Sequence, residues 1–190
     1  MLRNVRRAAG AGIVGVCTLV GCSTGGVVGG GGDASPVAVA LDLSQSGGLG
    51  TFEVQAGVPA ANRGTGRFFL SDLTAGSGSL RLDPAAVTVT PNGPQEDLSA
   101  VQSGASLVIT VRVDAIERQN TVCSEGDPYG PFHVTLDANN VPVSVSPRSV
   151  ALSESTIGLV NAASFSLCIR VESPMDATVE IARLNFNLNS

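Results

Sequence analysis

From about residue 36 onward, apolar and polar residues alternate in short runs, the pattern of β-strands that bury one face. In the two clearest runs, residues 107–113 and 164–171, every second side chain is apolar. Further strands are predicted at 37–43, 52–54, 67–73, 87–89, 132–137 and 141–145. No long stretch has the period of an amphipathic helix, and at most a turn is expected at 95–101.

Turn-forming residues separate these runs. Proline and glycine predict strong breaks at 91–94 and 127–131, and the Gly-Ser-Gly-Ser segment 76–79 predicts a flexible loop. Residues 138–140 (Ala-Asn-Asn) predict a tight hairpin, because asparagine tolerates the left-handed backbone conformation. Strands at this spacing predict an all-β domain: an antiparallel β-sandwich, immunoglobulin-like or jelly-roll-like, of about nine to eleven strands.

The last predicted strand changes phase partway along its length. Val179 and Ile181 share one parity, whereas Leu184 and Phe186 share the other. One extra residue in a strand reverses the faces to which the following side chains point. The pattern therefore predicts a β-bulge near residues 182–183.

The first 21 residues have the layout of an export signal. Arg3, Arg6 and Arg7 form a positive start, and residues 8–20 are an apolar run that only Thr18 interrupts. A resident membrane helix needs roughly 20 apolar residues, whereas the apolar core of an export signal needs about 7–15. The segment is therefore predicted to direct export and then to be removed.

The signal ends in Leu19-Val20-Gly21-Cys22, which resembles the lipobox of bacterial lipoproteins. The resemblance covers residues 1–22 only. It implies that the Cys22 thiol receives a diacylglycerol, that cleavage occurs before this cysteine, and that the new N-terminus is often acylated too. Cys17 is a poorer candidate because the apolar run before it is very short, and the remaining alternative is an ordinary cleavable signal with a chance cysteine.

A glycine-rich segment follows the cysteine and suits a flexible tether between an anchor and a folded domain. The chain is therefore divided into a lipoprotein signal peptide at 1–21, the lipidated cysteine and tether at 22–35, and a single β-sandwich domain at 36–190. Ser23 is not the aspartate that resembles an inner-membrane retention signal. We therefore expect an exported, membrane-anchored protein, on the outer membrane or the cell surface if the source has two membranes.

Composition limits the classes of partner that we expect for the exported domain. All 11 basic residues are arginine; without the three in the leader, eight arginines face 16 carboxylates, a net charge of −8. Nucleic acid and anionic lipid both bind clustered positive charge, so neither is an expected partner. The acidity suits a soluble exported domain, and the alternative is a surface for a cationic partner. The only protein partner that we expect is another protein of the envelope.

Two cysteines remain in the exported part, Cys123 and Cys168. Outside the cytoplasm an even pair predicts a disulfide. Cys168 shares its parity with Ser166 and Arg170 rather than with the apolar side chains of its strand, and Cys123 lies in the polar loop 117–131. The bridge is therefore predicted to pin that loop onto the polar face of a sheet, not to join two sheets through the core.

The residues of common catalytic sites are scarce. The absence of lysine excludes a P-loop lysine, a Schiff base and a Ser-x-x-Lys nucleophile. His133 lies between apolar residues on a predicted strand, as an outward structural side chain. One histidine and two bridged cysteines do not make a typical zinc site, so no cofactor, metal or catalytic residue is assigned.

Carboxylates offer two alternatives. Glu96 with Asp97, and Glu125 with Asp127, are neighbouring acids in loops, and a glycosidase needs only two carboxylates. Asp127 together with Asp137, Asn139 and Asn140 offers oxygen ligands of the kind that calcium prefers.

The leading functional hypothesis is a non-catalytic, lipid-anchored β-sandwich with a structural or protein-binding role in the envelope. The first alternative is a module that binds a small ligand, or a glycan with the help of calcium. The lack of tryptophan and the single Tyr129 weaken it, because aromatic platforms usually hold sugars. The second alternative is a carboxylate-based hydrolase.

Overall fold

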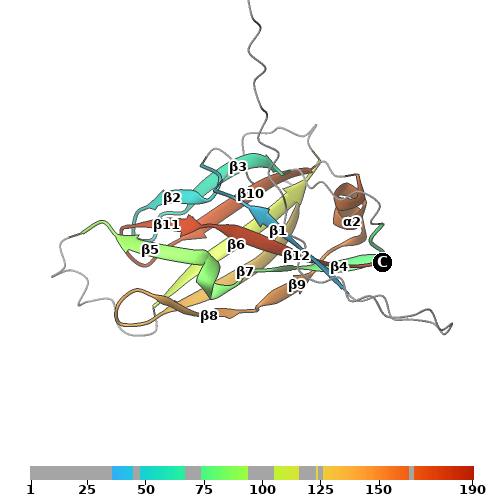
Figure 1. The fold of residues 1–190 in the computed structure, drawn as a ribbon. Coiled ribbons are helices and arrows are strands. Elements are labelled where there is room, and N and C mark those ends of the chain that lie inside the picture. The colour runs from blue at the N-terminus through green and yellow to red at the C-terminus, as the bar shows by residue number, and fades with distance from the viewer. Residues whose placement is uncertain are drawn as a thin grey trace, which may run out of the picture. The chain divides into compact units, whose positions relative to one another are not determined.

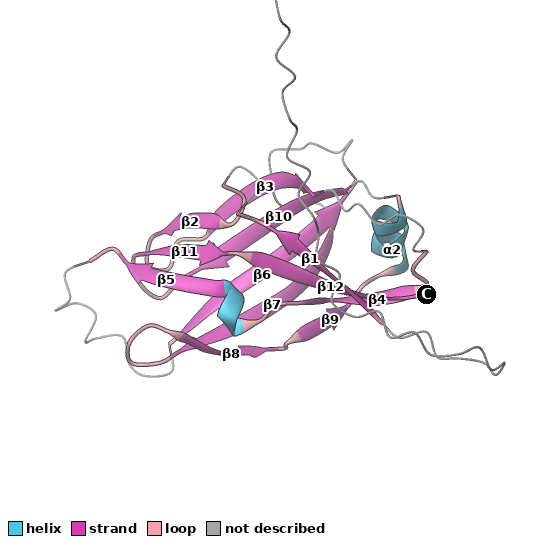
Figure 2. Cartoon of the chain, in the orientation of Figure 1, coloured by secondary structure: helices cyan, strands magenta, loops and turns pink. Residues whose placement is uncertain are grey.

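The computed structural model describes residues 36–44, 48–66, 74–93, 105–115, 123, 126–162 and 165–190. These residues contain twelve β-strands, one short α-helix and one 3₁₀ turn, against the nine to eleven strands expected. Every pairing between named strands is antiparallel. The predicted class, an antiparallel β-rich fold with a sandwich-like arrangement, is therefore confirmed (Figures 1 and 2).

One layer is a five-stranded sheet. Its strands, in spatial order, are β3 (Ala60–Gly66), β10 (Phe165–Glu172), β6 (Ser106–Asp114), β7 (Asp127–Leu136) and β8 (Pro142–Ser146). The two strands with the clearest alternation, β6 and β10, pair with each other in the middle of this sheet. The apolar side chains at their alternating inward positions are almost completely buried, as in a sheet with one face on the core.

Two smaller sheets form the rest of the β-structure. The four-stranded sheet has the order β1 (Val37–Asp42), β12 (Arg183–Asn189), β4 (Ser77–Arg81), β9 (Ser149–Ala151). The three-stranded sheet has the order β2 (Thr51–Val54), β11 (Ala177–Ile181), β5 (Val87–Pro91). A 3₁₀ turn, η1 (Pro84–Ala86), leads from β4 towards β5.

The change of phase in the last part of the chain falls where the chain passes from β11 of the three-stranded sheet to β12 of the four-stranded sheet. Ile181 and Leu184 are buried, whereas Ala182 and Arg183 between them are exposed. The Ala182 amide donates to the Ala86 carbonyl at 2.8 Å, and the Ala182 carbonyl accepts from the Leu43 amide at 2.9 Å. The expected bulge within one strand is therefore corrected: the chain breaks at Ala182 into two strands that pair in different sheets.

The core lies between the five-stranded sheet and the smaller sheets. Phe165 on β10 and Phe186 on β12 are both 0% exposed, and their ring centroids lie 6.0 Å apart. A contact between rings from two sheets ties the layers together. Each buried phenylalanine stabilises the fold by roughly 1.5–3 kcal/mol.

The helix α2 (Glu154–Asn161) was not expected from the sequence. Ser153 caps it, because its hydroxyl accepts a hydrogen bond from the Thr156 amide at 3.1 Å. Ile157 and Val160, three positions apart, are buried. Eight residues are too few for periodicity to distinguish this helix from a short strand, and its anchoring against the sandwich stabilises it.

Two further expectations at glycine-containing segments are wrong. Residues 76–79 are not a loop, since all but the first belong to β4. A Cβ atom at Gly78 would lie 2.8 Å from the Asn187 carbonyl oxygen, so the missing side chain allows the close approach of β12. Residues 127–131 are not a break either, since they begin β7.

The prolines of β7 are tolerated because this part of the strand lies at an edge. β7 pairs with β6 from Asp127 onward, whereas its pairing with β8 begins only at His133. Proline lacks an amide hydrogen and is accepted where no neighbouring strand needs one. A register shift between Ile109 and Val111 of β6 takes up the irregularity opposite Gly130, whose φ is +104°.

The predicted hairpin is confirmed. β7 ends at Leu136 and β8 begins at Pro142, and Asn140 has a φ of +62°. Strand β3, which has no alternating apolar residues, was missed. The predicted strand 67–73 and the turn at 95–101 lie outside the described residues.

Candidate functional site

The structure joins Cys123 to Cys168 by a disulfide whose Cα atoms lie 5.7 Å apart. This separation is within the range of roughly 4.4–6.8 Å that a disulfide requires. The pair is the one that the sequence predicts. Cys22, the predicted lipidation site, lies outside the described residues.

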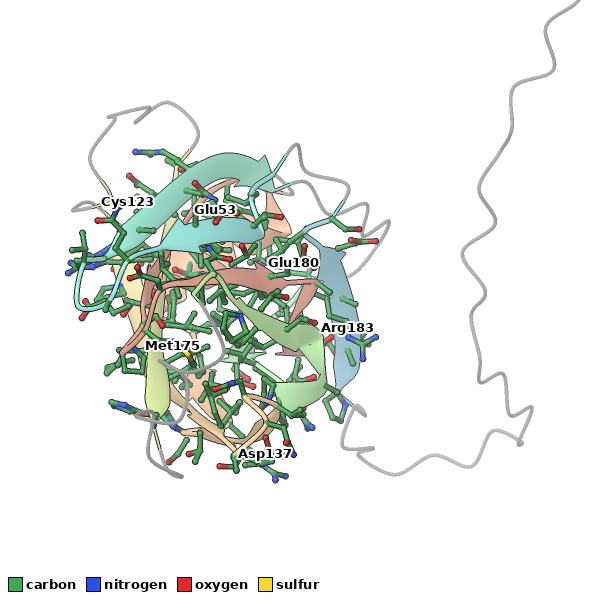
Figure 3. All side chains as sticks on the ribbon, turned by 90° about the vertical axis from the view of Figure 1, so that its left-hand side faces the viewer. Glu53, Cys123, Asp137, Met175, Glu180 and Arg183 are labelled. Atoms are coloured by element: carbon green, nitrogen blue, oxygen red, sulfur yellow. A yellow bond between two sulfur atoms is a disulfide. The ribbon has the colours of Figure 1, made fainter. Side chains whose placement is uncertain are left out.

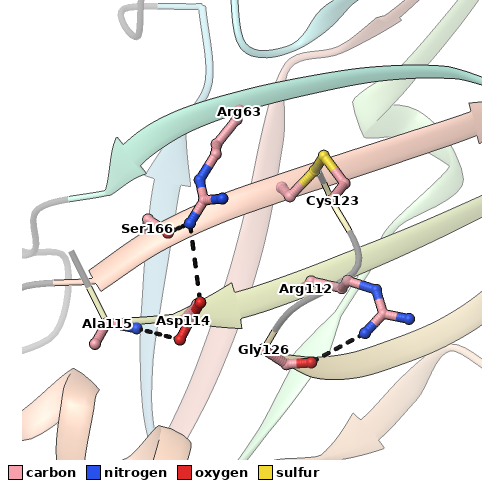
Figure 4. Close-up of polar contacts among 8 residues, drawn as sticks. Arg63, Arg112, Asp114, Ala115, Cys123, Gly126 and Ser166 are labelled. Carbon is pink, nitrogen blue, oxygen red and sulfur yellow. Dashed lines mark hydrogen bonds and ion pairs between the residues drawn. A yellow bond between two sulfur atoms is a disulfide. The ribbon is translucent and has the colours of Figure 1, made fainter. Parts of the chain in front are cut away.

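The disulfide lies on the outer face of the five-stranded sheet. Cys168 pairs in register with Arg63 on β3 and with Arg112 on β6. Its neighbours Leu167 and Ile169 are 0% exposed and point into the core. The bridge therefore does not cross between sheets, although Cys168 itself is buried at 5% exposure (Figure 4).

Polar side chains from three adjacent strands surround the disulfide. One row of paired residues across the sheet contains Arg63, Cys168 and Arg112. In the neighbouring row on one side, Ser166 pairs with Asp114. In the neighbouring row on the other side, Arg170 pairs with Thr110. We call this set, together with Glu172, the arginine face. It carries three arginines and two carboxylates, although residues 22–190 hold 16 carboxylates and only eight arginines.

Arg63 is held at one end of the arginine face. Its Nη2 donates to the Ser166 Oγ at 3.0 Å and lies 3.9 Å from the Asp114 Oδ2. Asp114 is 8% exposed, and its Oδ1 accepts the Ala115 amide at 2.8 Å. Since Oδ2 has no hydrogen-bond partner in the described part of the chain, the nearby guanidinium is what offsets the cost of burying this carboxylate.

The other two arginines lie beside an open hollow of about 140 Å³. Its described lining is Thr110, Arg112, Cys123, Cys168, Arg170 and Glu172. Arg112 Nη1 donates to the Gly126 carbonyl at 3.0 Å (Figure 4), and its described contacts include no carboxylate. Arg170 pairs with Glu172 at 2.8 Å, and both side chains are about half exposed.

A second polar cluster lies where β7 meets the start of α2. Asp127 Oδ2 accepts hydrogen bonds from the hydroxyls of Ser153 and Ser155 and, at 3.3 Å, from that of Thr156. Tyr129, 3% exposed, donates its hydroxyl to Thr156 Oγ1 at 2.6 Å. The cluster therefore fastens the N-terminus of α2 to β7, where a carboxylate also interacts favourably with the helix dipole.

These hydroxyl donors lower the pKa of Asp127 below its ordinary value of 3.8, with Ser153 the largest contributor and Ser155 next. Because the folded-state pKa lies below the unfolded value, the ionised carboxylate stabilises the fold above about pH 4. That contribution disappears as the pH falls through the lowered pKa.

Asp127→Asn should therefore lower the free energy of unfolding at pH 7 by about 1–2 kcal/mol, because the hydroxyl groups then donate to a neutral amide oxygen rather than to a charged carboxylate. The difference from the wild type should shrink as the pH falls below about 4. Urea unfolding at a series of pH values measures both effects. Glu180→Gln, at an exposed site on β11, is the matched control and should have little effect. Equal stabilities of Asp127→Asn and wild type at pH 7 would contradict this role of Asp127.

The four oxygen ligands suggested for calcium do not come together. Asp127 begins β7 and Asp137 follows its last residue, so a strand of about 30 Å separates them. Asp137 Oδ1 instead accepts the amides of Asn139 at 2.8 Å and Val141 at 2.9 Å, and these bonds lower its pKa. No cluster of three or more potential metal ligands occurs in the described parts of the chain.

Of the remaining predicted groups, only His133 lies among the described residues. His133 is exposed on β7, as expected, and pairs in register with Val108 and Ser146. The carboxylates Glu96, Asp97 and Glu125 lie outside the described residues. The arginine face was not identified from the sequence, although Arg112 and Arg170 occupy polar positions of the two clearest strands, a signal that could have indicated it.

Among the described residues, no helix is both long enough and apolar enough to cross a membrane. Comparison of the chain with protein-family models, with curated proteins and with solved structures gives no match.

Proposed function

We propose that the chain is an exported envelope protein, anchored by lipid at Cys22, whose β-sandwich has a structural or protein-binding role without catalysis. Of these roles, protein binding fits the geometry best. The support comes from the arginine face, a polar surface on the central strands of the five-stranded sheet.

The arginine face has the properties of a binding surface. Strands β10 and β6 hold its side chains in fixed relative positions, because each is paired on both sides. Binding sites on rigid elements are more precise than sites on loops. Arg170 and Glu172, at 50% and 44% side-chain exposure, remain accessible to a partner.

The other distinctive polar clusters have structural roles within the domain. Asp127 and its hydroxyl donors attach α2, and Asp137 shapes the β7–β8 hairpin. Carboxylates in such roles are already engaged with hydrogen-bond donors of the chain itself. The arginine face is therefore the observation that carries the proposal of a binding role.

Site-specific photo-crosslinking in the native cell tests this proposal. A photoreactive amino acid at Ala61, exposed on β3 beside Arg170, should give one discrete adduct with an envelope protein. The same probe at Thr88, exposed on β5 in the three-stranded sheet, is the matched control and should give none. Absence of an adduct from Ala61, or the same adduct from both positions, would count against a binding role of this face.

A further inference from the structure

We propose that the hollow beside the Cys123–Cys168 disulfide binds a side-chain carboxylate of an acidic protein segment, held by Arg112 and Arg170 with help from Thr110. This inference rests on the proposed protein-binding function and names the chemistry of the partner. The hollow, its two arginines and its hydroxyl lie together on the arginine face (Figure 4 shows the disulfide and Arg112).

The two arginines approach the hollow from adjacent strands. Arg112 is on β6 directly opposite Cys168, and Arg170 is on β10 two residues beyond Cys168, on the same face. Thr110 is directly opposite Arg170 on β6. Paired central strands and a covalent bridge limit the movement of the backbone here, so only the side chains need to be ordered when a ligand binds.

Arg112 retains the capacity to bind an anion. A guanidinium has five N–H donors, and among the described residues Arg112 uses one of them, for the Gly126 carbonyl. Arg170 is already paired with Glu172, but this pair is half exposed and solvent screens it strongly. An incoming carboxylate can therefore accept hydrogen bonds from the remaining donors of Arg112, and it competes with Glu172 for Arg170.

The shape and lining of the hollow favour a carboxylate. Its volume of about 140 Å³ suits a small group rather than an extended ligand. Arginine's planar fork matches the two oxygens of a carboxylate. No described residue of the lining is aromatic, whereas sugars and nucleic-acid bases usually stack on aromatic rings.

Charge complementarity favours a protein segment over a polyanion. The exported domain carries more acidic than basic residues, so it repels a long anionic polymer or membrane surface. At physiological ionic strength this repulsion is screened beyond about 8 Å. The binding of a single carboxylate beside Arg112 therefore depends mainly on the charges closest to it. An acidic side chain on a folded partner satisfies both conditions.

Fluorescence anisotropy with a labelled hexaglutamate peptide and the purified full-length protein in non-ionic detergent tests the inference. At physiological ionic strength, where the repulsion from the acidic domain is screened beyond about 8 Å, the wild type should bind hexaglutamate, and hexaglutamine should not bind. Arg112→Gln should weaken binding about tenfold, the size expected when hydrogen bonds to a charged group are lost. Glu172→Gln should strengthen binding, because it removes the competing carboxylate.

The opposite directions of these two changes separate ligand binding from a structural role. Arg183→Gln, at an exposed arginine on β12, removes the same charge from another sheet and should leave binding unchanged. If Arg112→Gln does not fold, Arg170→Gln carries the test, because Arg170 is half exposed and its pairing is with a surface carboxylate.

Failure of the wild type to bind hexaglutamate would overturn the inference, and so would equal effects of Arg112→Gln and Arg183→Gln. Displacement of hexaglutamate by an equal concentration of inorganic sulfate would also overturn it, because the hollow would then be a site for free oxyanions. If hexaglutamate fails while the adduct from Ala61 persists, the protein-binding function stands and the carboxylate site does not.

Discussion

Replacing Cys22 with alanine should move the protein from the membrane fraction to the soluble fraction while leaving the β-sandwich folded. Lipid attachment contributes about 0.8 kcal/mol per buried CH₂ group, and stable anchoring needs more than one acyl chain. Removing the acylated thiol removes all of these chains at once. Cell fractionation with immunoblotting measures the distribution, and urea unfolding of the released protein measures the fold.

The second leader cysteine provides the matched control. Cys17→Ala should leave the protein in the membrane fraction, because Cys17 lies within the apolar run of the signal. Persistence of the Cys22→Ala variant in washed membranes would require a different account of the whole leader. Soluble but unfolded protein would instead indicate that the segment around Cys22 contributes to the fold.

Loss of the Cys123–Cys168 bridge should lower the free energy of unfolding by about 2–4 kcal/mol. The bridge closes a loop of 45 residues and so restricts the unfolded chain. The variant Cys123→Ala/Cys168→Ala measures the effect in urea unfolding. Each single replacement should lower stability by a similar amount, because either one prevents the bond from forming.

The wild type in reducing agent is the internal control and should unfold at nearly the same urea concentration as the double variant. The double variant itself should be insensitive to reducing agent. If thiol labelling of the unreduced protein modified both Cys123 and Cys168, the bridge would be absent in solution and the prediction would fail.

The bridge also links stability to the arginine face. Cys168 lies between Arg63 and Arg112 in the register, and Cys123 lines the same hollow. One surface therefore combines a covalent restraint, a partly buried ion pair and accessible guanidinium groups. Figure 3 shows Cys123 on one side of the domain and Glu180 and Arg183 towards the other.

The fold class was predictable because most strands carry their own signal. In β6 and β10, alternation at period two reports the buried face directly, whatever the neighbouring strand. The β7–β8 hairpin was predictable for the same reason, since Asn140 adopts the positive φ that its residue type tolerates.

The missed elements have weak local signals. β3 and β4 consist largely of glycine, serine and other small or polar residues. They form strands because their backbones pair with β10 and β12, respectively. The prolines of β7 are compatible with a strand because, among the described residues, β8 pairs with β7 only from His133 onward. Whether a neighbour exists is a property of the assembled sheets and cannot be read from a local window.

The candidate site was likewise predictable only in part. Parity within one strand placed Cys168 on a polar face and predicted where the bridge would lie. It could not bring Arg112 beside Arg170, because strands far apart in the sequence meet in a register set by the whole sheet.

The sequence by itself determined the β-rich class and the cysteine pair, and it is the sole basis for the predicted leader and its resemblance to lipoproteins, because each depends on composition or on short-range order. Only the tertiary structure decided the strand order, the break at Ala182, the attachment of α2 by Asp127 and the gathering of arginines around the disulfide. These features depend on contacts between residues distant in the chain, whose energies no local pattern contains.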